Sequence, residues 1–251
     1  MQIQATEVDL QTPTGTMRCY VYRPKDSSHG ECKKFPAIVL YSEIFQQTSP
    51  IRRSAQIMAG HGFIVLVPEV FHELNPLGTV LGYDDAGRDK GNADKVAKSL
   101  EAHDSDIQTI IDYVASLDYY SGRIGAMGFC LGGGLAYRAA INPAISATSC
   151  FYATDIHSGL IPSQPGNASL TRTREIKGEL QMIWGKQDPH IPAEGRALVY
   201  KKLSDEAVNF TWHEFNGVHA FMRDEGDRYD AELQLLGYQM AIGMFRRVLY
   251  Q

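Results

Sequence analysis

The sequence has little of what disulfide-rich, membrane-spanning or nucleic-acid-binding proteins need. Four cysteines among 251 residues are too few for a disulfide scaffold, and no two of them form a C-x-x-C pair. No apolar run approaches the roughly 20 residues that a membrane-spanning helix requires. The formal net charge is −5 and the 24 lysines and arginines are scattered along the chain, which argues against nucleic acid as a partner.

The first ten residues also lack the pattern of a targeting signal. Polar and apolar residues alternate there, and no basic region precedes an apolar stretch. We therefore expect a cytoplasmic protein with reduced thiols that binds neither membranes nor nucleic acids. The composition is 44% hydrophobic and 21% charged, as in globular proteins, and no repeat or shift in composition divides the chain. The sequence thus predicts a single domain over residues 1–251.

Short apolar runs and segments of helical periodicity alternate through most of the chain. Apolar strands separated by helices are typical of an α/β fold, a mostly parallel sheet with helices on both faces. Near the N-terminus, two alternating segments flank Pro13-Thr14-Gly15 and predict an antiparallel hairpin. The predicted strands cover residues 3–10, 17–22, 35–41, 63–67, 123–129, 146–152, 179–184 and 208–215, and the predicted helices cover 50–59, 104–116, 131–141, 193–203 and 229–248.

Turn and loop signals complete this outline. Ser49-Pro50 supplies a cap and a first-turn proline for the first predicted helix, and Gly62 is expected to end it. Residues 68–92 and 154–175 are long and weakly periodic, so we expect two loops there. Long loops in a compact domain often form the walls of a binding site.

A cysteine lies where one predicted strand turns directly into a helix. Gly128-Phe129-Cys130-Leu131-Gly132 is a nucleophile elbow written G-x-C-x-G, in which the tight turn requires small neighbours. The N-terminus of the following helix would stabilise a Cys130 thiolate, and the N–H of Leu131 would point to where an oxyanion forms. The alternative is an inert buried cysteine. Cys19 and Cys150 lie in strand patterns and are expected in the core, whereas Cys32 lies in a polar linker.

An elbow of this kind needs a carboxylate and a histidine, which follow the nucleophile in chain order. Asp188 comes directly after the strand predicted at 179–184, although it could also cap the helix that begins near residue 193. His219 comes after the last predicted strand, where the general base belongs. We therefore predict a triad of Cys130, Asp188 and His219.

These residues carry a resemblance to the dienelactone hydrolase family, also called carboxymethylenebutenolidase, a cysteine branch of the α/β-hydrolase fold. The resemblance implies that Cys130 is the nucleophile, His219 the base and acid, and Asp188 the orienting carboxylate. It further implies that Glu43 faces the thiol and that the N–H groups of Ile44 and Leu131 form the oxyanion hole. The matching motifs are Glu43-Ile44-Phe45, Gly128-Phe129-Cys130-Leu131-Gly132-Gly133, Gly185-x-x-Asp188-x-x-Ile191-Pro192 and Gly217-x-His219-x-Phe221.

The resemblance also implies two substrate-binding arginines. Family members that open dienelactones hold the substrate carboxylate with arginines, one of them four residues after the histidine, which is Arg223 here. Arg88, in the predicted loop 68–92, is the nearest counterpart of the second. It is flanked by acidic residues, so an ordinary surface ion pair is an equally good interpretation of Arg88.

Together these features predict a cysteine hydrolase that opens lactones or activated esters of small, carboxylate-bearing molecules through a thioester. A broader carboxylesterase or thioesterase is the main alternative, and a non-catalytic ligand-binding protein is another. No H-E-x-x-H or Cys/His cluster predicts a metal, and no phosphate-binding loop predicts a cofactor. We expect a small-molecule ester or lactone as the partner, and a monomer or homodimer.

Overall fold

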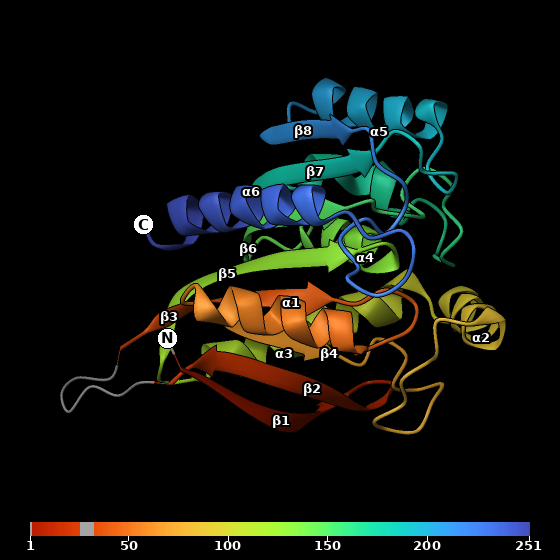
Figure 1. Cartoon of the computed structure of the whole chain (residues 1–251). Coiled ribbons are helices and arrows are strands. Elements are labelled where there is room, and N and C mark those ends of the chain that lie inside the picture. Colours follow the sequence, from red (N-terminus) through yellow and green to blue (C-terminus); the bar gives the residue numbers. More distant parts are fainter. Residues whose placement is uncertain (1, 26–32) are drawn as a thin grey trace.

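The computed structural model describes residues 2–25 and 33–251, so Cys32 lies outside the described residues. An eight-stranded sheet runs through it in the order β1-β2-β4-β3-β5-β6-β7-β8 (Figure 1). β1, β2 and β4 pair antiparallel, and all other neighbours pair parallel. The strands are β1 Ile3–Thr12, β2 Gly15–Pro24, β3 Phe35–Tyr41, β4 Ile64–Pro68, β5 Tyr120–Phe129, β6 Ile145–Phe151, β7 Glu179–Gly185 and β8 Phe210–Phe215.

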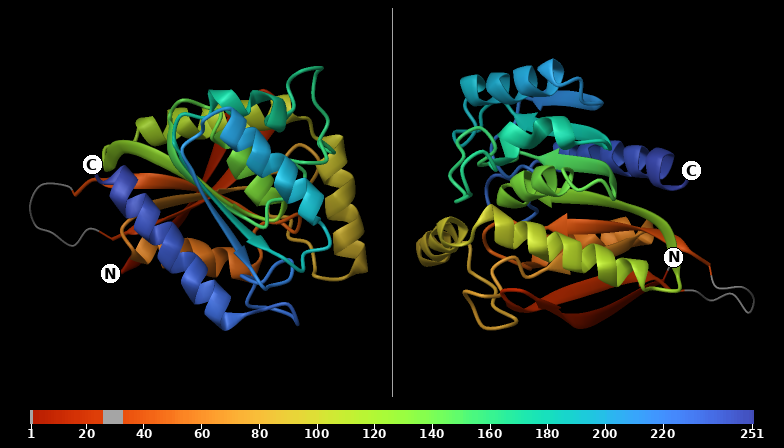
Figure 2. Two further views of the ribbon diagram at one scale, coloured as in Figure 1. Left: turned by 90° about the horizontal axis from the view of Figure 1, so that it is seen from above. Right: turned by 180° about the vertical axis from the view of Figure 1, so that it is seen from behind.

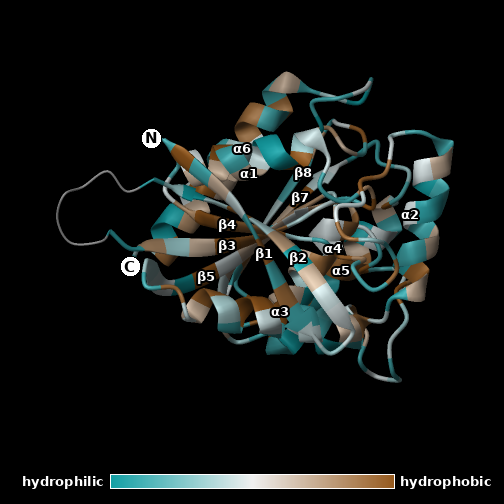
Figure 3. Ribbon diagram, turned by 90° about the horizontal axis from the view of Figure 1, so that it is seen from below, coloured by the Kyte–Doolittle hydropathy of each residue, from teal (hydrophilic) through white to brown (hydrophobic). Residues whose placement is uncertain are grey.

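Helices cover both faces of the sheet, which confirms the predicted α/β fold (Figure 2). α1 and α6 pack on one face, and α3, α4 and α5 lie on the other. Every residue of β3 and β4 is buried, as the continuous apolar runs predict, and both strands are hydrophobic in Figure 3. The helices are α1 Ser49–Gly60, α2 Asp85–Ala97, α3 Leu100–Ala115, α4 Leu131–Ala139, α5 Ala193–Asp205 and α6 Ala231–Leu249, with a 3₁₀ helix at Ser169–Glu175.

The loop predicted at 68–92 is wrong from Asp85 onward, because helix α2 begins there. The Asp84 side chain caps this helix by accepting a hydrogen bond from the Gly87 N–H at 2.8 Å. α2 buries only three of its residues, so it has no apolar stripe for a periodicity argument to find. The helix lies beyond the carboxyl ends of the parallel strands (Figure 1), where it can form one wall of a site.

Several other predicted boundaries also differ from the observed ones. The residue that caps α1 is Thr48, not Ser49, and its side chain makes no capping hydrogen bond. α3 begins at Leu100, because the Ser99 hydroxyl accepts a hydrogen bond from the Ala102 N–H. The end of the predicted 154–175 loop forms the 3₁₀ helix. Gly62 follows α1 with φ +101°, a conformation that suits glycine at a helix end.

None of the helices within the described ranges has both the length and the apolar character needed to cross a membrane. Ligands of open parallel sheets bind at the carboxyl ends of the strands, which here are the ends of β3, β5, β6 and β7.

Candidate active site

Cys130 sits in a strained turn between β5 and α4. Its backbone has φ 58° and ψ −121°, a region that residues other than glycine rarely adopt. The Cys130 N–H donates to the Phe151 carbonyl at 3.1 Å, and its carbonyl accepts from the N–H groups of Gly133 at 3.0 Å and Thr154 at 3.1 Å. The ends of two neighbouring strands thus hold the strained residue in place.

The glycines on either side of Cys130 are required by close backbone contacts. A Cβ at Gly128 would collide with the carbonyl of Gly132, and a Cβ at Gly132 would collide with the carbonyl of Tyr41. The spacing G-x-C-x-G therefore reflects the packing of this turn, as the elbow interpretation predicts.

His219 and Asp188 form a buried hydrogen-bonded pair. His219 Nδ1 lies 2.6 Å from Asp188 Oδ2, and the two residues are only 5% and 4% exposed. The second oxygen of Asp188 accepts a hydrogen bond from the His190 N–H at 2.8 Å. With Nδ1–H donating to the carboxylate, Nε2 of the imidazole is left for a reacting group.

The electrostatic surroundings favour the charged form of His219. Burial disfavours the imidazolium, but the Cys130 thiolate and the hydrogen-bonded Asp188 outweigh it and raise the pKa of His219 to about 10. The surroundings of His219 therefore favour its imidazolium form near neutral pH.

Glu43 lies just after β3 and is 3% exposed. One carboxylate oxygen, Oε2, lies 3.5 Å from the Tyr83 hydroxyl and 3.7 Å from Arg223. Burial raises the pKa of Glu43, opposed mainly by the charge of Arg223.

A cleft of about 480 Å³ brings most of the predicted site residues together. Cys130 and His219 line it, while Asp188 and Leu131 are buried and are not among its lining residues. Within the described ranges, no carbonyl or side-chain oxygen accepts a hydrogen bond from the N–H of Ile44 or Leu131. The cleft is lined by Glu43, Ile44, Phe45, Tyr83, Asp84, Asp85, Arg88, Asn92, Lys95, Cys130, Thr154, His190, His219, Arg223, Asp227 and Arg228.

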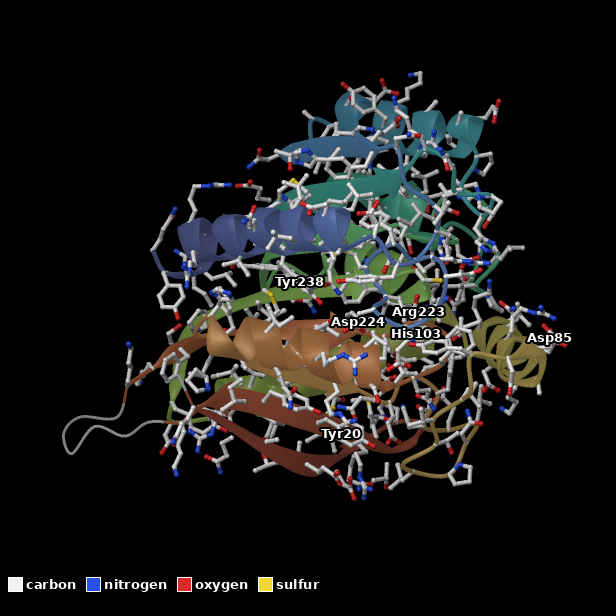
Figure 4. The ribbon with its side chains drawn as sticks, in the orientation of Figure 1. Tyr20, Asp85, His103, Arg223, Asp224 and Tyr238 are labelled. Carbon is white, nitrogen blue, oxygen red and sulfur yellow. The ribbon has the colours of Figure 1, made fainter. Side chains whose placement is uncertain are left out.

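The two predicted arginines lie in different surroundings. The Arg223 guanidinium stacks over the Tyr83 ring at 4.3 Å, and its side chain is 13% exposed. Arg88 is 53% exposed and donates hydrogen bonds to Asp85 at 2.8 Å and to Asp89 at 2.9 Å. Figure 4 shows Arg223 on the loop before α6 and Asp85 on α2, which form two walls of the cleft.

Sequence reasoning missed several residues that line the cleft. Lys95 reaches from α2 to Asp155 at 3.2 Å, and His190 packs edge-on against His219 with ring centroids 4.6 Å apart. Tyr83 and Arg228 also face the cleft, and no ion pair of Arg228 is found in the described part of the chain. These residues lie in loops or on the polar helix α2, where no periodicity or motif identifies them.

The thiols differ in accessibility. Cys19 and Cys150 are fully buried, and burial raises the pKa of each thiol far above its usual range, whereas Cys130 lines the cleft. No group of three or more His, Cys, Asp or Glu side chains that could hold a metal ion is found in residues 2–25 and 33–251.

We therefore expect iodoacetamide near neutral pH to modify Cys130 before Cys19 or Cys150, because only the thiolate reacts. Peptide mapping by mass spectrometry of a Cys32→Ser variant measures the order among these three thiols. Earlier labelling of Cys19 or Cys150 with activity retained would contradict the assignment.

The chain is similar to known proteins along most of its length. The model of the "Dienelactone hydrolase family" matches residues 17–249. A Saccharomyces cerevisiae protein, whose name gives carboxymethylenebutenolidase as an unproven assignment, is 41% identical over 232 residues, which are 90% of this chain and 84% of that protein. The carboxymethylenebutenolidase of Pseudomonas putida is 26% identical over 204 residues, 80% of this chain and 81% of that one.

A solved structure from Klebsiella pneumoniae, whose name gives dienelactone hydrolase as an unproven assignment, superposes with a TM-score of 0.83. It is 20% identical, and the match covers 98% of this chain and 99% of that one. At that identity the likeness shows the fold, the α/β-hydrolase arrangement that the sequence predicts. The family match and the yeast relative show more: the chain belongs to the dienelactone hydrolase family and is an ester or lactone hydrolase.

Proposed function

We propose that the protein is a cysteine-dependent hydrolase that opens lactones or activated esters of small, carboxylate-bearing molecules through a thioester intermediate. The observation that carries the proposal is that the strained Cys130 lines the same cleft as His219, which is hydrogen-bonded to Asp188. A nucleophile, a base and an orienting carboxylate in this order are the elements of covalent acyl transfer.

In the first half of the reaction, His219 holds the proton of the catalytic pair and the Cys130 thiolate attacks the ester carbonyl. The oxyanion forms beside the free N–H groups of Ile44 and Leu131. Each such donor contributes about 3 to 4 kcal/mol to stabilising the transition state in comparable sites. His219 then protonates the leaving oxygen as the thioester forms.

In the second half, His219 takes a proton from water, which attacks the thioester carbonyl and expels the Cys130 thiolate. A thiolate leaves a tetrahedral intermediate more easily than an amide nitrogen or an alkyl alkoxide does. Substrates with a good leaving group, such as enol esters and lactones of enols, therefore suit this nucleophile, and amides should react poorly.

One observation favours a broader carboxylesterase as the second candidate. Three of the four cations that line the cleft have an acidic partner: Arg88 has Asp85 and Asp89, Lys95 has Asp155, and Arg223 has Glu43. A cleft with balanced charges can also accept neutral esters.

A panel of enol lactones, aryl esters, alkyl esters, thioesters and amides tests the proposal through kcat/KM. We expect enol lactones and aryl esters to react fastest and amides to be inert. Equal rates on alkyl and enol esters would favour the broader carboxylesterase.

Replacing Arg223 separates the two candidates further. If Arg223 contacts a substrate carboxylate, Arg223→Ala should lower kcat/KM for a carboxylate-bearing lactone by about 30-fold or more. Truncating one partner of a desolvated pair costs about 2 to 5 kcal/mol, whereas a solvated pair is worth about 0 to 1. The same lactone as its neutral methyl ester should change little, and the ratio of the two rate constants is the measurement.

Arg88→Ala is the matched control at the mouth of the cleft. Because Arg88 is half exposed and already paired to two aspartates, its loss should change the acid-to-ester ratio less than the loss of Arg223. If both variants keep wild-type selectivity, carboxylate recognition by these arginines is refuted and the general esterase is the better interpretation.

A further inference from the structure

A second, much smaller cavity lies against the site, beside Glu43. Its volume of about 10 Å³ has room for the centre of one water molecule. Four of its lining residues carry polar side chains, and the rest are apolar. The lining residues are Glu43, Pro50, Ile51, Ser54, Phe129, Tyr152, Met222 and Arg223.

Tyr152 is held in this lining by a strained backbone. It follows β6 with φ +35°, which is unusual for a bulky residue, and its N–H donates to the Ile183 carbonyl at 2.7 Å. Phe151 and Thr154, which lie next to it in the chain or two residues away, both form hydrogen bonds to the backbone of Cys130. Strain maintained directly beside a nucleophile is the kind of outlier that indicates a functional constraint.

The Tyr152 ring is 1% exposed and packs edge-on against His219, with ring centroids 5.1 Å apart. Burial, together with the charges of Glu43 and Cys130, raises the pKa of Tyr152 well above its usual value, so the hydroxyl keeps its proton. Tyr152 therefore carries a hydrogen-bond donor into the interior of the site.

Two polar groups of buried residues in this lining make no hydrogen bond within residues 2–25 and 33–251. The hydroxyl of Tyr152 makes no hydrogen bond there, and the contacts of the Glu43 carboxylate both involve Oε2, which leaves Oε1 without a donor. Polar groups of buried residues are usually bonded to another protein group or to an ordered water molecule, so this hydroxyl and this oxygen are open to such a water. The Ser54 hydroxyl is already bonded to the Pro50 carbonyl and the Tyr238 hydroxyl.

We propose that this cavity is a binding site for one water molecule that bridges the Tyr152 hydroxyl and Glu43 Oε1, and that Tyr152 thereby positions the carboxylate beside the nucleophile. Tyr152 donates to the water, and the water donates to the carboxylate. The Ser54 hydroxyl can complete the shell of about three partners that buried waters typically have. The positioning role rests on the proposed function of Glu43 and Cys130, whereas the water site does not.

The bridge has a consequence for the ionisation of Glu43. The charged and titratable groups that act on this carboxylate or lie around it are Arg223, His219, Tyr83, Arg228 and Tyr152, and Cys130 lines the same cleft. A donor directed at Oε1 stabilises the ionised form, so removing the Tyr152 hydroxyl should shift Glu43 ionisation to higher pH.

Tyr152→Phe tests the proposal because it removes the hydroxyl and keeps the ring against His219. High-resolution crystal structures of the wild type and this variant should show one water within hydrogen-bond distance of Tyr152 Oη and Glu43 Oε1 in the wild type only. Absence of that water from the wild type, or its retention at the same place in the variant, would overturn the proposal.

The pH dependence of Cys130 alkylation by iodoacetamide tests positioning without a substrate. An inflection in the plot of alkylation rate against pH that disappears in Glu43→Gln reports the ionisation of Glu43. We expect Tyr152→Phe to move this inflection upward by about one pH unit. Tyr137→Phe is the matched control, because this buried tyrosine bonds Thr173 away from the cleft and should leave the inflection unchanged. An unmoved inflection in Tyr152→Phe refutes the positioning role, whereas turnover retained by Cys130→Ala would refute the proposed function alone.

Discussion

Cys130→Ala should abolish ester turnover, lowering kcat/KM by about 10⁴-fold or more. The alanine variant has no atom that can attack the carbonyl, so only the oxyanion donors and the binding of substrate remain. Cys130→Ser should leave at most weak activity, because the serine hydroxyl needs a stronger base than a thiol does. Steady-state kinetics with an aryl ester and an enol lactone measure both effects.

Cys150→Ala is the matched control for loss of a thiol. Cys150 is fully buried on β6, so its replacement should lower the free energy of unfolding and leave the specific activity of the folded protein near that of the wild type. If Cys130→Ala hydrolyses the aryl ester at the wild-type rate, another residue is the nucleophile and the proposed thioester is excluded.

The sheet could be predicted because burial leaves a direct trace in the sequence. β3 and β4 are buried along their whole length, so they appear as continuous apolar runs. Helix α2 leaves no such trace, since it lies at the edge of the molecule and buries only Gly87, Gly91 and Asp94. A polar helix of this kind cannot be distinguished from a loop by hydrophobic periodicity.

The candidate site likewise contains residues that the sequence predicts and residues that it does not. Cys130, Asp188 and His219 lie at strand ends, and a parallel sheet brings the carboxyl ends of its strands together, so their order along the chain predicts that they meet. Neither Tyr83 nor Arg228 has such an anchor. Their places in the cleft depend on the conformation of the long loops. Tertiary contacts determine that conformation, and no sequence pattern shows those contacts.

The surroundings of Arg88 could be predicted from the sequence only in part. Its acidic neighbours in the sequence make an ion pair possible. They do not determine whether the side chain points toward them or toward the cleft. The structure shows both, because Arg88 lines the mouth of the cleft while its guanidinium is bonded to Asp85 and Asp89. Whether such a paired arginine also binds a substrate carboxylate is a question of competing free energies, which the selectivity ratio of Arg88→Ala measures.

His219→Ala should be nearly as damaging as loss of the nucleophile, and Asp188→Asn should cost about 10- to 100-fold less. Without the imidazole, no group in the proposed mechanism can protonate the leaving oxygen or activate the water that hydrolyses the thioester. Asparagine keeps the shape of Asp188 but offers no charge to the buried imidazolium, and its amide can hold the wrong tautomer of the ring.

His219→Ala and Asp188→Asn can be compared directly because both residues are almost fully buried and His219 Nδ1 lies 2.6 Å from Asp188 Oδ2. A general loss of packing would therefore affect both variants alike. Thermal unfolding of each variant provides the control for such a loss.

Single-turnover kinetics then separate formation of the acyl-enzyme from its hydrolysis. His219→Ala should accumulate the thioester after any slow acylation, because deacylation needs the base that the variant lacks. Full turnover by His219→Ala would reject the proposed triad, whereas equal losses in the two variants would mean that Asp188 does more than orient the imidazole.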